Sequence, residues 1–194
     1  MSREYFNTVA ASWDEKVDHN RRKIKEMMVH FPDISSPGIL DVGTGTGIMI
    51  PFLKSRYPRA SIIGIDFAEN MIEQARGKYG TLEKTEFEVA DIYDCHYREQ
   101  FDLITVYSVF PHLRQRKTIL QLFFEYLQQD GFLIIFHSQS RREINNLHSR
   151  SGEEVARDRL PPAVELKEAF CRAGFSPQRV IDGNDRYFIM GKKS

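Results

Sequence analysis

Several short, largely apolar runs in the middle of this chain are separated by segments with a helical pattern. The apolar runs are residues 39–42, 60–66, 86–91, 101–109 and 132–137. The helix-like segments between them cover 48–57, 68–79 and 114–129. Strands of this kind are buried on both faces, which is typical of a parallel sheet covered by helices. We therefore predict an α/β fold with a doubly wound, mostly parallel sheet and helices on both faces.

The end of the chain has a different pattern. A helix at 162–173 stops at Gly174, and two strand-like runs follow at 178–181 and 186–191. The connection between these runs contains a Gly-Asn pair, which favours a hairpin. We expect seven strands in all, with an antiparallel strand at the C-terminus.

Composition limits the partners of this chain. Lys and Arg together number 27, as do Asp and Glu, so the formal charge is zero and a general nucleic-acid binder is disfavoured. No apolar run approaches the ~18 residues of a membrane span. The first residues carry acids and no apolar core, and the chain has only two cysteines, so we expect a cytoplasmic protein in a reducing compartment.

A glycine-rich loop follows the first apolar run, in the sequence Ile-Leu-Asp-Val-Gly-Thr-Gly-Thr-Gly at 39–47. Gly43, Gly45 and Gly47 lie between a strand and a helix, where glycine allows a sharp turn and the close approach of a ligand. A dinucleotide-binding loop normally reads G-x-G-x-x-G, and here the third glycine comes one residue early. The loop fits an adenosyl ligand at least as well as a dinucleotide.

Three acids follow or end neighbouring strands. Asp41 precedes the glycine loop, Asp66 ends the second run, and Asp91 ends the third. Asp66 is placed to accept hydrogen bonds from ribose hydroxyls, and Asp91 from an adenine amino group. Asp41 would repel a pyrophosphate but would suit a cationic amino group. The three acids together favour a ligand that carries positive charge.

From residue 36 to 137 the chain resembles the class I S-adenosylmethionine-dependent methyltransferases. The resemblance rests on the motifs ILDVGTGTG, GIDFAENMIEQAR, FEVADIYD, FDLITVYSVFPHL and LQQDGFLIIFHS. It implies a Rossmann-like seven-stranded fold, S-adenosyl-L-methionine as cofactor, and methyl transfer as the activity.

The resemblance also implies a role for each matching residue. It places the glycine loop against the methionine and ribose parts, Asp41 near the amino group, and Asp66 at the ribose. The loop residues in question are Gly43, Thr44, Gly45 and Gly47. The adenine would lie among Phe67, Met71, Asp91 and Ile92. Tyr107 would lie near the sulfonium, and Tyr5 and Trp13 resemble positions that close over the cofactor.

The chain is interpreted as one domain of 194 residues. Its parts are an N-terminal helical cap (1–35), a cofactor-binding core (36–137), a polar insertion (138–160), and a C-terminal helix and hairpin (161–194). In the cap, Ile24, Met27, Met28 and Phe31 form one apolar stripe. We expect residues 1–30 and 138–160 to pack over the carboxyl ends of the strands.

The acceptor is expected to be a small molecule. Ser108 to His112 lack the Pro-Pro-aromatic segment of methyltransferases that act on DNA bases, and no nucleic-acid or membrane partner is expected. The candidate catalytic residues are His112, His137, His148 and Arg141. A histidine could serve as general base, and Arg141 could orient an anionic group. The spacing of the histidines gives no metal signature, and a monomer or a homodimer is expected.

Two other functions are compatible with these residues. An oxidoreductase that uses a nicotinamide cofactor would share the glycine loop and Asp66, although Asp41 and Asp91 disfavour it. A protein that binds an adenosyl ligand without catalysis would share the whole site.

Overall fold

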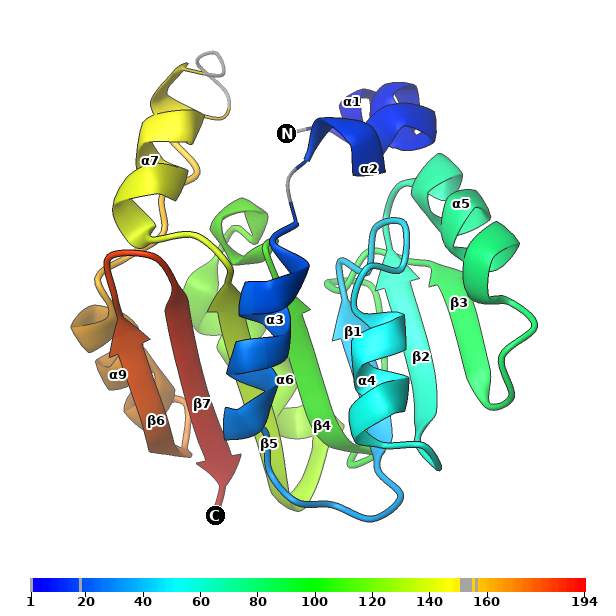
Figure 1. Ribbon diagram of the computed structural model, residues 1–194. Coiled ribbons are helices and arrows are strands. Elements are labelled where there is room, and N and C mark those ends of the chain that lie inside the picture. The colour runs from blue at the N-terminus through cyan, green and yellow to red at the C-terminus, as the bar shows by residue number, and fades with distance from the viewer. Residues whose placement is uncertain (1, 18, 151–154, 156) are drawn as a thin grey trace.

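The computed structural model describes residues 2–17, 19–150, 155 and 157–194. Its centre is a seven-stranded sheet in the order β3-β2-β1-β4-β5-β7-β6 (Figure 1). The strands are β1 (Gly38–Val42), β2 (Ser61–Asp66), β3 (Thr85–Val89), β4 (Phe101–Tyr107), β5 (Leu127–His137), β6 (Phe175–Asp182) and β7 (Tyr187–Lys193). This order confirms the predicted fold.

Strands β1 to β5 are parallel, so their carboxyl ends meet at one edge of the sheet, here called the carboxyl edge. Strand β7 lies between β5 and β6 and runs antiparallel to both. This confirms the hairpin that the Gly-Asn pair predicts. The insertion of β7 pairs His137 with Tyr187 across the two strands.

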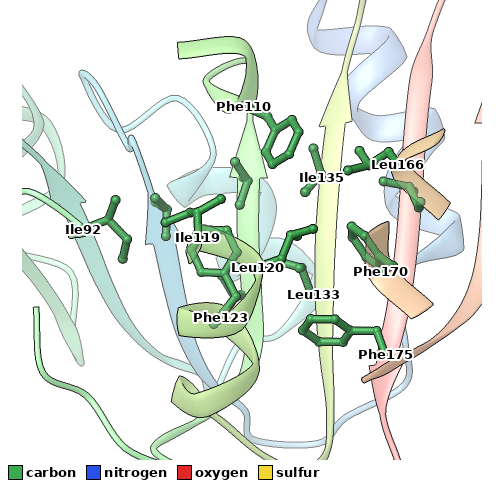
Figure 2. Close-up of a cluster of buried hydrophobic side chains, with 14 of the residues drawn as sticks. Ile92, Phe110, Ile119, Leu120, Phe123, Leu133, Ile135, Leu166, Phe170 and Phe175 are labelled. Atoms are coloured by element: carbon green, nitrogen blue, oxygen red, sulfur yellow. The ribbon is translucent and has the colours of Figure 1, made fainter. Parts of the chain in front are cut away.

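Helices cover both faces of the sheet (Figure 1). On one face lie α3 (Arg21–Met27), α4 (Ile50–Arg56) and α5 (Glu69–Tyr79), and on the other lie α6 (Arg116–Tyr126) and α9 (Ala163–Arg172). Figure 2 shows the second face, where side chains of α6 and α9 pack on those of β4, β5 and β6. Because both faces of the sheet are covered, its central strands β1, β4 and β7 are largely buried, whereas the edge strands β3 and β6 are partly exposed.

The elements that remain lie above the carboxyl edge (Figure 1). They are α1 (Arg3–Val9), η1 (Ala10–Ser12), α2 (Trp13–Lys16) and α7 (Arg141–Arg150). Short 3-10 turns are also present at η2 (Met28–His30) and η3 (Phe110–His112). The part of the insertion at 151–154 and 156 lies outside the described residues.

Helix α3 differs from the expectation for residues 1–30, because it packs on the face of the sheet and not over its edge. Its side chains Ile24 and Met27 are fully buried against that face. The apolar stripe of the cap is therefore correct, and it fixes α3 to the core.

Several predicted boundaries also differ, and two of them affect the site or the sheet pairing. Strand β5 begins at Leu127, so the helix expected to reach residue 129 ends at Tyr126. Strand β3 ends at Val89, which places Asp91 in the loop that follows. In the described part of the chain, no helix is long and apolar enough to cross a membrane.

Candidate functional site

A cavity of about 190 Å³ opens at the carboxyl edge. Its walls come from the glycine loop, the ends of β2 and β4, the loop after β3, the turn η3, and the N-terminal helices. The predicted cofactor residues that line it are Gly43, Thr44, Gly45, Asp66, Phe67, Met71, Asp91, Ile92 and Tyr107. The parallel strands gather these residues because their carboxyl ends share one edge.

Gly45 provides the open part of the loop. Its φ is +54°, a conformation that favours glycine, and a Cβ added there would meet nothing within 4 Å. At Gly43, in contrast, an added Cβ would lie 2.6 Å from Val109. Gly47 does not line the cavity, and a Cβ there would lie 2.7 Å from Tyr79. Gly45 therefore leaves room for a ligand, whereas the other two glycines permit close packing.

Asp66 fixes the shape of this loop. Its Oδ2 accepts a hydrogen bond from the backbone N–H of Gly45 at 3.0 Å, and its Oδ1 accepts one from Ala68 at 2.9 Å. Burial raises the pKa of Asp66 to about 6. Its carboxylate can accept further hydrogen bonds from the cavity side.

Asp41 lies beneath the loop and does not line the cavity. Its Oδ1 accepts a hydrogen bond from Thr105 at 2.7 Å, while its Oδ2 is buried without a hydrogen-bond partner. The hydroxyl of Thr44 is likewise buried and unpartnered. Burial raises the pKa of Asp41 to about 6. Unsatisfied buried polar atoms beside an open loop are compatible with a polar ligand at this place.

The opposite wall is largely apolar. Phe67, Met71 and Ile92 line it, with Met71 and Ile92 buried. Asp91 adds a carboxylate whose Oδ1 accepts a hydrogen bond from the N–H of Tyr93 at 3.1 Å. A flat apolar ring with polar edges would fit such a wall.

The N-terminal helices cover the cavity. The ring of Phe6 lies 5.7 Å from that of Phe67 and 5.6 Å from that of Trp13, which also lines the cavity. Tyr5 is exposed, and its ring packs edge-on against that of Phe6. Of the two aromatic residues expected to close the site, Trp13 reaches it and Tyr5 does not.

Polar contacts hold this cover in place. The side chain and the backbone carbonyl of Asn7 both accept hydrogen bonds from Asn70, at 3.0 Å each. Asp14 accepts a hydrogen bond from Thr46 of the glycine loop at 2.5 Å and also pairs with Lys78. The cover is thus attached to the loop and to α5, the two elements that flank the cavity.

The structure brings His112 and His148 together. Their ring centroids are 4.9 Å apart, and Nδ1 of His112 lies 2.9 Å from Oδ2 of Asp158. Nδ1 of His148 contacts the backbone carbonyl of Asp158. Of the three candidate histidines, only His112 lines the cavity. Burial lowers the pKa of His112 to about 4, so its ring is neutral at pH 7.

His137 is the last residue of β5 and does not line the cavity. It is 2% exposed, its Nε2 has no hydrogen-bond partner, and its ring centroid is 6.1 Å from that of Tyr187. Burial, together with positive charge on His112 or His148, lowers its pKa to about 3. Arg141 pairs with Asp182 at 3.0 Å and does not line the cavity.

Several residues at the site are not predicted from the sequence, among them Phe6, His19 and Asp158. Phe6 and His19 line the cavity, and Asp158 contacts His112. His19 also lies near Tyr107, with ring centroids 5.7 Å apart. The position of Phe6 next to Tyr5 is the one feature of the sequence that could have indicated it. Asp158 has no feature in the sequence that separates it from the other acids of the polar insertion.

Comparison with known proteins gives the same family. Residues 39–131 match the model of a family described as "Methyltransferase domain". A malonyl-[acyl-carrier protein] O-methyltransferase of Geobacter sulfurreducens is 30% identical over 195 residues, which cover 94% of this chain and 73% of that protein. The enzyme of the same name from Bacillus anthracis is 28% identical over 155 residues, which cover 77% of this chain and 57% of that protein. The chain therefore spans little more than half the length of several curated relatives.

Solved structures agree on the fold. A SAM-dependent methyltransferase from Aquifex aeolicus matches with a TM-score of 0.75 and 17% identity, over 100% of both chains. A Haloferax volcanii complex of a methyltransferase with the Trm112 activator gives a TM-score of 0.81 and 18% identity, over 97% of both chains. By its sheet order, its glycine loop and these relatives, the chain belongs to the class I S-adenosylmethionine-dependent methyltransferases, whose methyl donor is S-adenosyl-L-methionine.

Proposed function

We propose that the protein transfers a methyl group from S-adenosyl-L-methionine to a small-molecule acceptor bound in the same cavity. The observation that carries this proposal is the open side of Gly45, which faces the cavity beside the Asp66 carboxylate. The buried unpartnered oxygens of Asp41 and Thr44 lie close by. When bound, the donor supplies a methyl group on a positively charged sulfur.

Each predicted cofactor residue has a proposed task. The backbone of Gly43, Thr44 and Gly45 lies against the methionine and ribose parts, and Asp66 accepts hydrogen bonds from the ribose. Asp41 supplies negative charge under the loop, and Gly47 lets the loop pack on α5. The residues proposed for the adenine are Phe67, Met71, Asp91 and Ile92. Tyr107, whose hydroxyl shares a hydrogen bond with Ser138 at 2.8 Å, borders the reacting end.

On the acceptor side, His112 is the candidate with access to the cavity. His148 packs against its ring, His137 is buried at the end of β5 outside the cavity, and Arg141 braces α7 against Asp182. The relatives named as malonyl-[acyl-carrier protein] O-methyltransferases make a carrier-bound acyl group a second candidate acceptor. A protein activator, such as the one in the Haloferax volcanii complex, is a candidate partner.

Calorimetry with S-adenosylhomocysteine tests donor binding. Gly45→Asn should abolish binding, because Asn tolerates a positive φ while its side chain fills the space beside the loop. Gly77→Asn is the matched control, since a Cβ there also meets nothing within 4 Å but Gly77 does not line the cavity. Equal affinity in both variants would contradict the proposed donor site.

Turnover separates the remaining alternatives. The wild-type protein should bind S-adenosylhomocysteine in preference to a nicotinamide dinucleotide, and should methylate at least one compound of an acceptor panel. Tighter binding of the dinucleotide would favour an oxidoreductase. Donor binding with no product across the panel would favour a protein that only senses the adenosyl ligand.

A further inference from the structure

His112 is not an isolated histidine beside the cavity, because its ring contacts a buried carboxylate. The turn η3, directly after β4, carries His112 to the cavity wall, where its side chain is 12% exposed. Its Nδ1 lies 2.9 Å from a carboxylate oxygen of Asp158. An ionised carboxylate only accepts hydrogen bonds, so Nδ1 carries the hydrogen and Nε2 keeps its lone pair. This is the tautomer that a proton acceptor needs.

Asp158 is itself held firmly. Its side chain is 7% exposed, and its backbone carbonyl accepts a hydrogen bond from Nδ1 of His148 in α7. Two residues farther on, the backbone of Leu160 both donates to and accepts from the side chain of Asn145, at 2.8 and 3.0 Å. Arg116 of α6 donates to the carbonyl of Arg159. Contacts to two helices thus fix the segment that presents the carboxylate.

We infer, on the basis of the proposed methyl transfer, that Asp158 is the positioning residue for His112 as general base, and that the acceptor is a hydroxyl or amine and not a carboxylate. The bond between the acceptor atom and its hydrogen breaks as the proton passes to Nε2 of His112. The electron pair left on the acceptor forms the bond to the methyl carbon, and the carbon–sulfur pair stays on sulfur. Asp158 then offsets the charge on the imidazolium, which later releases its proton to water.

The cavity wall supports this class of acceptor. None of the described residues that line the cavity is Lys or Arg, and two, Asp66 and Asp91, are acids. A carboxylate acceptor is already ionised and would need no base. With no fixed cation in the wall to offset its charge, moving it from water into the cavity would cost much free energy. Arg141 cannot supply one while it pairs with Asp182. Among the described residues, the titratable groups that act on His112 are Asp158 and His148, and burial keeps the ring neutral at pH 7.

The test compares Asp158→Asn with wild type and with Asp158→Glu. The asparagine variant should lose roughly 10- to 10³-fold in kcat, with little change in acceptor KM, because the base is misplaced while the cavity remains. The glutamate variant should recover part of the loss. Unchanged affinity for S-adenosylhomocysteine shows that the donor half is intact in both variants.

A second readout needs no acceptor. Nitrogen NMR of the His112 ring should show hydrogen on Nδ1 in the wild type and a shifted tautomer balance in Asp158→Asn. Wild-type kcat together with a wild-type tautomer in Asp158→Asn would overturn the inference, as would a panel in which only carboxylates are methylated. Loss of donor binding in the wild type would instead contradict the proposed function.

Discussion

The proposed donor and acceptor halves of the cavity are assembled from the sequence in different ways. The donor half comes largely from two continuous stretches, the glycine loop at 39–47 and the segment from Asp66 to Met71. The proposed acceptor half combines Phe6 and His112, which line the cavity, with Asp158, which contacts His112, and the three lie far apart in the sequence. The donor half can therefore be recognised from residue spacing, whereas the acceptor half exists only in the folded protein.

Their electrostatics differ as well. Burial raises the pKa of Asp41 and Asp66 to about 6, and it lowers the pKa of His112 to about 4 and that of His137 to about 3. At pH 7 Asp41 and Asp66 are thus negatively charged, while His112 and His137 are neutral. This contrast suits a cationic donor on one side and a proton acceptor on the other.

The largest effect is expected on the acceptor side. His112→Gln should lower kcat by about 10²–10⁴, the range for loss of a general base. Its affinity for S-adenosylhomocysteine should stay within a factor of two or so, because the donor half is untouched. Steady-state kinetics and calorimetry measure the two quantities. An equal loss in both would mean that the halves are not independent.

The next largest effect concerns the donor side. Asp66→Ala should weaken S-adenosylhomocysteine binding by about 1–3 kcal/mol, because hydrogen bonds to a charged acceptor are lost. The variant also removes the acceptor for the N–H groups of Gly45 and Ala68. Asp66→Asn, which keeps one oxygen, should lose less. Wild-type affinity in the alanine variant, measured by calorimetry, would remove Asp66 from the donor half.

A third prediction uses the buried His137. Its pKa is about 3 in the folded protein and about 6.5 when unfolded. Below pH 6.5 the unfolded ring gains a proton that the folded ring does not, so this contribution to stability is lost as the pH falls. One such proton corresponds to about 1.4 kcal/mol per pH unit.

Urea denaturation between pH 7 and pH 4.5 measures this slope. His137→Leu should unfold with a shallower dependence on pH than the wild type. His96→Leu is the control, because His96 is exposed and its ring stays in water on folding. Parallel curves for the wild type and His137→Leu would show that His137 is not buried as a neutral ring.

The smallest effect is expected at the cover of the cavity. Asp14→Ala removes the contacts to Thr46 and Lys78. Since the side chain of Asp14 is 47% exposed, the loss in unfolding free energy should stay below about 1 kcal/mol. The dissociation rate of S-adenosylhomocysteine, measured by stopped flow, should rise a few-fold. An unchanged rate would mean that the cover does not retain the donor.

Much of the fold could be predicted because its signals are local. The apolar runs identify the parallel strands, and a Gly-Asn pair identifies the terminal hairpin. Boundaries were less certain: β3 ends at Val89, so Asp91 lies in a loop, and β5 starts at Leu127. Pairing across the sheet extends β5 beyond its apolar part, and no local pattern reports that pairing.

The acceptor half could be predicted only in outline. Histidines near the carboxyl edge pointed to His112, since its position after β4 is local information. Its partner Asp158 is 46 residues away and sits between two arginines, like an ordinary exposed acid. That carboxylate is buried only when the segment from Asp158 to Leu160 packs against α6 and α7.

The position of β7 has a consequence for how the chain is made. Strand β5 ends at His137, but its neighbour on one side begins only at Tyr187. At about 5–20 residues per second, a ribosome needs roughly 3–10 s to synthesise the chain between these points. During that time β5 is an unpaired apolar edge, the kind of strand that joins other chains. The sheet is therefore vulnerable to aggregation until almost the last residue of β7 has left the ribosome.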